Sequence, residues 1–186
     1  MNFDEFTQQA LRTESKIETA NVDLGGFKTL LRMFIVVGTL LDYTKKGIFY
    51  NNYEKYNENY PALVSELNDL LLDFVTNSNQ GREDYTGCNY RVLHGILGSL
   101  TESAELAEHL LRHIETGEID KAGLGEEYSD GDWYKAIIFD ELGIDESTVR
   151  MNVINKLRVR FPDKFCAEHA ANRDLKAERE ELEKNI

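Results

Sequence analysis

Proline and cysteine are scarce in this chain, which has two of each among its 186 residues. Since proline interrupts helices, its scarcity together with 30% charged residues favours a mainly helical protein. Cys88 and Cys166 lie in unrelated sequence contexts, without the spacing of metal ligands. We expect both to be reduced thiols in a cytoplasmic protein and not parts of a disulfide scaffold.

Positive charge is also in short supply, because 21 Lys and Arg residues stand against 34 Asp and Glu and give a formal net charge of −13. Non-specific binding to nucleic acid needs clustered cations on the phosphates, so we expect no nucleic-acid partner. An anionic substrate would require local cations or a metal ion.

Long apolar runs and several common motifs are missing. The longest apolar run, Phe27 to Leu41, is interrupted by Lys28, Thr29 and Arg32, so we expect no membrane span. The first residues, MNFDEFTQQALRTESK, lack the basic start and apolar centre of a signal peptide. The sequence shows no glycine-rich phosphate loop, no zinc pattern among its histidines and no convincing strand pattern. A soluble, cytoplasmic protein is the expectation.

Apolar spacing predicts one all-α domain over residues 1–186. We divide it into N-terminal helices with an insertion (1–87), a central helical core (90–165) and a peripheral C-terminal helix (167–186). The expected helices are Phe3–Thr13, Phe27–Lys46, Pro61–Thr76, Tyr90–Thr116, Leu124–Leu142 and one that follows Asp145 or Ser147 and runs to Arg160. Gly47 is expected to end the second helix and Pro61 to begin the third. Residues 49–60 read as irregular, and residues 77–87 as an exposed loop.

Two pairs of acids stand out on the central helices. They are Glu102 with Glu105 and Glu127 with Asp130. The members of each pair are three residues apart and therefore lie on nearly the same helix face. Four carboxylates facing one another would raise each other's pKa unless a cation lay between them. Hard oxygen ligands suit Mg²⁺, with Mn²⁺ as a substitute. The pattern therefore indicates a metal-dependent enzyme.

The second pair carries the stronger signal. Glu127 and Asp130 share a helix face with Tyr134, Ile137 and Ile138, and acids in line with an apolar stripe are expensive to bury unless paired or bound to metal.

The first pair is more ambiguous. Glu102 and Glu105 lie opposite the apolar stripe of their own helix, beside Gly98 and His109. Taken alone, they are typical of a solvated face, which only a further helix or a partner subunit would enclose.

A basic stripe follows on the next helix, where Asn152, Lys156 and Arg160 recur at four-residue intervals. An amide, an amine and a guanidinium in a row could bind the phosphates of a metal-bound triphosphate if this helix packs against the acids. Without that packing, the three residues form an ordinary solvated face.

Three blocks of sequence, taken in order, resemble the MazG-like family of all-α nucleoside triphosphate pyrophosphohydrolases. They are LHGILGSLTESAELAE (93–108), EEYSDGDWY (126–134) and NKLRVRFPDKF (155–165). The family pattern is Glu-x-x-Glu, a spacer and Glu-x-x-Asp, followed by a helix with Lys and an Arg-aromatic-Pro ending. The chain departs from that pattern at Thr101, where the family usually has glycine, and at Ser129 and Gly131 around the last acid.

The resemblance implies a reaction and the residues that serve it. Family members cleave between the α and β phosphates, which converts a (deoxy)nucleoside triphosphate to the monophosphate and pyrophosphate. The resemblance implies that Mg²⁺ is held by Glu102, Glu105, Glu127 and Asp130. It implies that the phosphates are contacted by Lys156 and, with it, Asn152 and Arg160. It also implies a homodimer or homotetramer.

Other readings remain open. The same site could act on another nucleotide, such as an alarmone or a modified deoxynucleotide. The chain could instead be a helical regulatory protein that binds nucleotide or metal without turnover. Aromatic residues of segment 49–60, with Trp133 and Tyr134, are candidates for a base pocket, although Trp133 and Tyr134 fit a core better.

Overall fold

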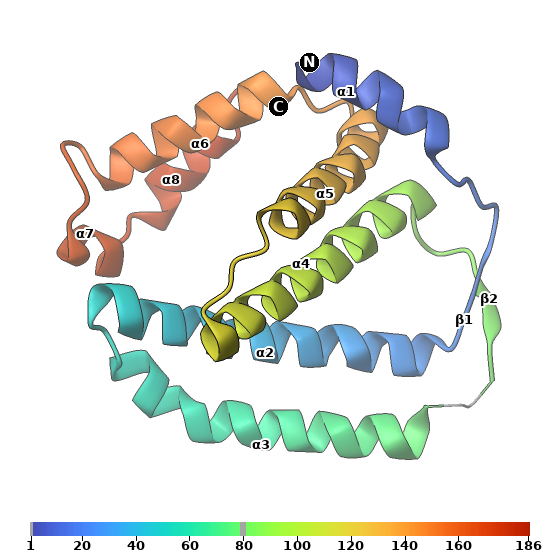
Figure 1. Cartoon of the computed structure of the whole chain (residues 1–186), viewed down its shortest axis with the longest axis horizontal. Coiled ribbons are helices and arrows are strands. Elements are labelled where there is room, and N and C mark those ends of the chain that lie inside the picture. Colours follow the sequence, from blue (N-terminus) through green and yellow to red (C-terminus); the bar gives the residue numbers. More distant parts are fainter. Residues whose placement is uncertain (1, 79–80) are drawn as a thin grey trace. The chain divides into compact units, whose positions relative to one another are not determined.

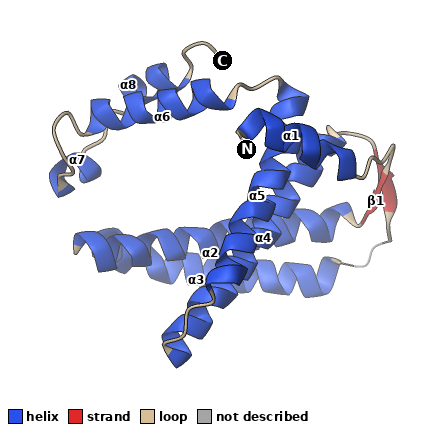
Figure 2. Ribbon diagram, turned by 45° about the horizontal axis from the view of Figure 1, so that its top comes forward, coloured by secondary structure: helices blue, strands red, loops and turns tan. Residues whose placement is uncertain are grey.

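The computed structural model describes residues 2–78 and 81–186, and most of these residues are helical (Figure 2). An all-α chain was expected, and this coarse prediction is confirmed apart from two three-residue strands. The elements are α1 (Phe3–Ala10), η1 (Leu11–Thr13), β1 (Ala20–Val22), α2 (Leu24–Tyr50), α3 (Glu54–Asn77), β2 (Glu83–Tyr85), α4 (Tyr90–Thr116), α5 (Lys121–Leu142), α6 (Glu146–Arg160), α7 (Ala167–Ala171) and α8 (Leu175–Leu182).

The chain packs as two compact units. Thr19–Gly87 forms one unit, and the residues up to Glu18 join Cys88–Ile186 in the other. The first of these holds the antiparallel helices α2 and α3, and the second holds the pair α4 and α5 (Figure 1). The acid-bearing helices therefore belong to a unit that the N-terminal helix helps to build, because α1 packs on α5.

The two ends of unit 19–87 are joined by a small antiparallel sheet of two strands, which the sequence pattern did not predict. Residues Ala20 and Val22 of β1 pair with Tyr85 and Glu83 of β2. The strands are too short to show an alternating pattern, since three residues hold one period. Part of the predicted loop 77–87 is therefore β2, and residues 79–80 of that loop lie outside the described residues.

Gly47 does not end its helix, so that prediction is wrong. The glycine is buried inside α2, where the ring of Tyr53 occupies the space that a side chain would need. The helix ends instead at Asn51, whose φ of 51° is the left-handed conformation that terminates helices. Gly47 thus serves close packing and not chain reversal.

Pro61 does not begin its helix either. It lies inside α3, which starts at Glu54, so most of the segment read as irregular is helical. A proline within a helix removes one backbone hydrogen bond, and α3 accommodates that loss. The rings of Tyr56 and Tyr60 stack one turn apart, with centroids 5.1 Å from each other.

The apolar helix α2 is longer than expected. By length and composition it could span a membrane, with a mean hydropathy of 1.6 over its most apolar 18-residue window. Core helices of soluble proteins meet the same criterion when they are mostly buried, whereas 17% of this window is buried. The expected absence of a membrane span and the cytoplasmic location therefore stay predictions. Within the unit, α2 is tied to α3 by a hydrogen bond of 2.8 Å from the hydroxyl of buried Thr29 to Asp73.

The bounds of α4 are those that the sequence predicts, and α5 begins three residues earlier than predicted. The early start of α5 follows from its cap, because the Asp120 side chain accepts hydrogen bonds from the backbone N–H groups of Ala122 and Gly123. The cap of α6 is also as predicted, since Asp145 accepts from the N–H of Thr148.

Helices α4 and α5 meet along a face of α4 that carries glycines. A Cβ at Gly95 would overlap Ile138, and one at Gly98 would overlap the ring of Tyr134. The glycines therefore let the two helices approach closely, with Ile137 fully buried beside them. The stripe that apolar spacing placed in the core is largely exposed and includes Ile96, Leu111 and Ile114.

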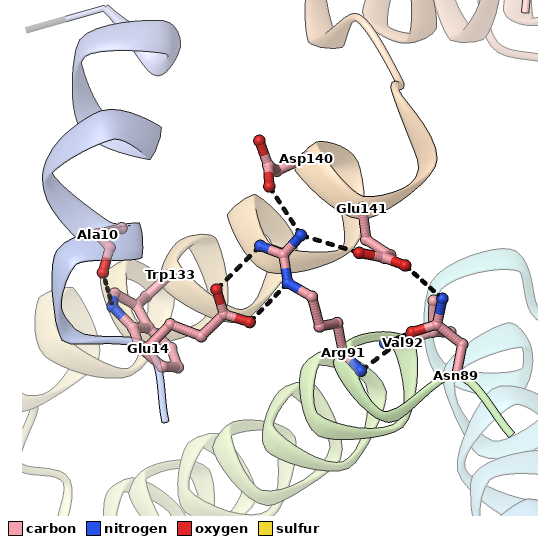
Figure 3. A network of polar contacts seen from close by, with 8 residues as sticks. All are labelled: Ala10, Glu14, Asn89, Arg91, Val92, Trp133, Asp140 and Glu141. Atoms are coloured by element: carbon pink, nitrogen blue, oxygen red, sulfur yellow. Dashed lines mark hydrogen bonds and ion pairs between the residues drawn. The ribbon is translucent and has the colours of Figure 1, made fainter. Parts of the chain in front are cut away.

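An ionic network joins the N-terminal segment to α4 and α5 (Figure 3). The Arg91 guanidinium contacts Glu14 at 2.7 Å, Asp140 at 2.8 Å and Glu141 at 2.9 Å. The side chain of Glu14 is only 1% exposed, and its hydrogen bonds raise the pKa of Arg91 above the ordinary value. Arg91 thus compensates a carboxylate that would be costly to bury alone.

Replacing Gly98 should show how closely α4 and α5 must approach. We expect Gly98→Ala to lower the free energy of unfolding by about 1–3 kcal/mol, because the new methyl group displaces the Tyr134 ring. Gly131→Ala is the matched control in α5, where a Cβ meets nothing within 4 Å. The control should be neutral or stabilise by up to about 1 kcal/mol, as alanine does in helices. Urea unfolding measures both, and equal effects would contradict the packing described.

Removing Arg91 should leave Glu14 buried and unpaired. We expect Arg91→Met to destabilise the chain by about 3–5 kcal/mol, as is typical when one partner of a buried ion pair is lost. The double variant Glu14→Leu with Arg91→Met removes the orphaned charge and should recover much of that loss. Thermal and urea unfolding provide the comparison. A double variant no more stable than Arg91→Met would show that Arg91 acts chiefly through Asp140 and Glu141.

Candidate functional site

Three carboxylates from α4 and α5 converge. Glu102 and Glu127 are each only 8% exposed, and Asp130 lies one turn further along α5 at the surface. One oxygen from each of the three side chains lies within 4.8 Å of the others. We call Glu102, Glu127 and Asp130 the carboxylate cluster. The close helix approach described above places acids from two helices within reach of a single ion.

Because Glu102 is buried, the interpretation of the first acid pair as a solvated face is wrong for this residue. Glu102 continues the glycine face of α4 and packs against α5, so no partner subunit is needed to enclose it. The helical wheel misplaced it because apolar side chains were taken to mark the buried face. Glu105 is exposed, as that reading has it.

Glu105 nevertheless belongs to the electrostatic site. Its pKa is raised first by the negative charge of Glu127, with further contributions from desolvation and from Glu108. The fourth predicted acid therefore faces the cluster from the surface side, although its oxygens are not among the three that converge. All four predicted acids lie in one region.

Crowding of the acids alters their protonation. The pKa of Glu102 is raised by burial first, then by its hydrogen bond with Glu127 and by the charges of Glu105 and Asp130. Burial first, and then the charges of Glu102, Asp130 and Glu105, raise the pKa of the adjacent Tyr134, so its phenol stays neutral. In the absence of a cation, the cluster favours holding a proton. A divalent cation would offset the same repulsion, and carboxylate oxygens are the ligands that Mg²⁺ and Mn²⁺ prefer.

His109 is a neighbour of the cluster that the sequence pattern did not assign. Its Nε2 lies 3.6 Å from a carboxylate oxygen of Glu127. Gly123 of α5 lies against the imidazole, and a Cβ there would overlap the ring. The signal was present in the sequence, because His109 is four residues after Glu105 and therefore lies on the same side of α4.

The basic stripe of α6 is engaged elsewhere in the same unit. The Asn152 amide donates to the carbonyl oxygens of Leu182, at 3.3 Å, and Lys184, at 2.6 Å. Arg160 pairs at 2.8 Å with Glu178 of α8. These contacts fasten α6 to the C-terminal segment, and the phosphate-binding role of Asn152 and Arg160 stays a prediction. Lys156, the third member, is half-buried on α6.

Buried Glu178 explains why Arg160 is needed on α6. Its side chain is 3% exposed and also pairs with Arg173 at 2.6 Å. Hydrogen bonds from Arg160 and then Arg173 lower the pKa of Glu178 to about 2. The predicted C-terminal helix is accordingly two helices, α7 and α8, of which α8 packs on α6.

Trp133 and Tyr134, predicted to fit a core better than a base pocket, are half-buried and pack against other residues of their unit. The indole N–H of Trp133 donates to the carbonyl oxygen of Ala10 at 3.1 Å. Its ring meets Tyr134 and His94 edge to face, at centroid distances of 4.9 and 5.7 Å. These rings join α1 to α4 and α5, and they stand behind the carboxylate cluster.

Comparisons of the chain with sequence models of known families, with curated proteins and with solved structures found no match.

Repulsion in the cluster predicts how metal-free stability changes with pH. The pKa of Glu102 in the folded chain is raised above its ordinary value of 4.5, so the folded state binds more protons than the unfolded state just above pH 4.5. This group therefore destabilises the fold progressively as the pH rises through that window. In EDTA at neutral pH, Glu102→Gln should melt about 2–4 °C above the parent protein, the shift that 1 kcal/mol gives for a chain of this size.

Two comparisons make that expectation specific. The difference between parent and Glu102→Gln should shrink as the pH is lowered toward 4.5. Mg²⁺ or Mn²⁺ should raise the melting temperature of the parent protein and have little effect on the variant, since binding to the folded state alone stabilises it. A variant that melts below the parent in EDTA would mean that Glu102 is paired and not repelled.

Proposed function

We propose that this chain is a Mg²⁺-dependent nucleoside triphosphate pyrophosphohydrolase of the MazG-like type. The observation that carries the proposal is the convergence of Glu102, Glu127 and Asp130 within 4.8 Å, two of them buried. Such burial of like charges is costly unless a cation is held there. The order and spacing of the acids in the sequence follow the pattern of that family given above.

The chemistry follows from the donor set. Glu102, Glu127 and Asp130 would hold the ion, with Glu105 at the open side of the cluster. When bound there, a divalent ion would supply positive charge for the triphosphate and lower the pKa of a water molecule, which could then attack phosphorus. One of the carboxylates would accept the proton of that water. Glu105 and Asp130 are exposed, so a nucleotide could reach the cluster from the solvent on their side.

Anion binding completes the proposal. Lys156 would contact the phosphates, together with Asn152 and Arg160 if the contacts of these two with the C-terminal segment open. A homodimer or homotetramer would bring further surface to the exposed side of the cluster. A cytoplasmic location agrees with the reduced cysteines, Cys88 and Cys166, which are both free.

A second candidate function is a regulatory protein that binds metal or nucleotide without turnover. The engagement of Asn152 and Arg160 with the C-terminal segment favours it, because the contacts named above use the groups that would otherwise meet phosphate. The carboxylate cluster would then serve binding alone.

Pyrophosphate release from a panel of ribo- and deoxynucleoside triphosphates tests the proposed reaction. We expect release with Mg²⁺ or Mn²⁺ and none in EDTA. Glu127→Gln and Asp130→Asn should each lower the rate by at least about 100-fold, the upper end of the loss seen when only outer-shell partners of a metal are removed. Glu126→Gln is the matched control, since Glu126 is exposed and adjoins the cluster in sequence only.

The same panel separates the two candidates. No release from any nucleotide, by a folded protein that still binds Mn²⁺, would favour the regulatory protein. Chromatography of the products distinguishes cleavage between the α and β phosphates from loss of a single phosphate. Equal activity of Glu126→Gln and Glu127→Gln would show that the carboxylate cluster takes no part in the reaction.

A further inference from the structure

We propose that a pocket at the junction of α4 and α5 binds the base of the nucleotide whose phosphates meet the carboxylate cluster. This inference rests on the proposed function and adds the part of the site that recognises the nucleoside.

The pocket has a volume of about 430 Å³ and lies between the last turns of α4 and the first turns of α5. Small-molecule sites commonly have volumes of about 300–1,000 Å³ and are mostly apolar with a few polar groups. This pocket has that character. Aliphatic walls come from Leu106, Leu110 and Leu124, and three rings line it, those of His109, His113 and Tyr128.

The pocket and the carboxylate cluster are linked by one shared neighbour. His109 belongs to both, because it lines the pocket while its Nε2 lies 3.6 Å from the Glu127 carboxylate. A ligand that spans the two must carry an anionic end for the metal and a largely apolar body for the pocket. A nucleoside triphosphate has both parts.

The rings favour a flat heterocycle over an aliphatic chain. Aromatic and imidazole side chains stack on nucleobases, whose faces are all π-systems. Tyr128 is 68% exposed, so its ring is available to close over a base.

Polar groups at the rim can read the edge of the base. Asp120 accepts from the backbone N–H groups of Ala122 and Gly123, and these bonds lower the pKa of its carboxyl, so it stays ionised. His113 Nδ1 lies 3.1 Å from the carbonyl oxygen of Glu118. In the neutral ring, that bond places the proton on Nδ1 and leaves Nε2 as an acceptor. Both groups therefore accept hydrogen bonds, which suits a base that presents amino or imino N–H donors.

Binding of uncleavable nucleotides separates the pocket from the metal site. The ligands are α,β-methylene nucleoside triphosphates of several bases and inorganic tripolyphosphate, titrated calorimetrically with Mn²⁺ present. Tripolyphosphate reports on the carboxylate cluster alone. We expect at least one nucleotide to bind about tenfold or more tightly than tripolyphosphate to the parent protein.

Variants of the lining give the decisive comparison. Leu110→Trp fills the pocket, and Tyr128→Ala removes the stacking ring. Both should bring the affinity for the nucleotide down to that for tripolyphosphate and leave tripolyphosphate binding unchanged. Leu111→Trp is the matched control, because Leu111 is the next residue of α4, equally exposed and outside the lining. Tyr128→Phe keeps the ring and should bind as the parent does.

The outcomes distinguish the two proposals. Equal binding of nucleotides and tripolyphosphate by the parent protein, or equal effects of Leu110→Trp and Leu111→Trp, would overturn the pocket and leave the metal site standing. Absence of all binding, or binding that Glu127→Gln does not change, would overturn the proposed function and the pocket with it.

Discussion

The close approach of α4 to α5 is the constraint on which the site depends. Gly95 and Gly98 leave room for Ile138 and Tyr134, and the same face of α4 continues one turn later as Glu102. Helices separated by ordinary side chains would hold Glu102 and Glu127 further apart, and each acid could then be solvated on its own. Because glycines at these two positions let the helices approach closely, the negative charges of Glu102 and Glu127 are brought together. The pKa of Glu102 is raised as a result, by burial first and then by the neighbouring acids.

A second set of charges has the opposite character. Arg91 compensates buried Glu14 and surrounds itself with Asp140 and Glu141, while Arg160 and Arg173 compensate buried Glu178. In these networks each buried acid has a cation, and the pKa of Glu178 is lowered accordingly. Glu102 differs, because the groups that surround it are further acids. The chain thus contains two kinds of buried carboxylate: those paired with arginines of the same chain, and Glu102, whose pKa is raised by burial and by neighbouring acids.

Sequence reasoning located the acids and most helices but not the faces that they bury. Hydrophobic spacing was sufficient to place α4, and the three-residue spacing within each acid pair predicted the four acids that lie in one region. The prediction failed where a glycine allows close packing because it has no side chain, as at Gly47 and Gly98. Hydrophobic periodicity gives no sign that such a glycine is buried. The contacts of Asn152 and Arg160 with the C-terminal segment were also beyond reach, because they depend on where α8 packs.

The strand pair has a consequence for how such a chain can be assembled. Because β1 and β2 are hydrogen-bonded neighbours, residues 19–87 begin and end at adjacent points. The segment is a module with its two ends together, so the unit that carries the carboxylate cluster could in principle be closed by a short turn in its place. Evolution and protein engineers can therefore exchange, lengthen or delete α2 and α3 without moving the ends that they join. Helices α4 and α5 and the helical hairpin of α2 and α3 are thus free to diversify at different rates.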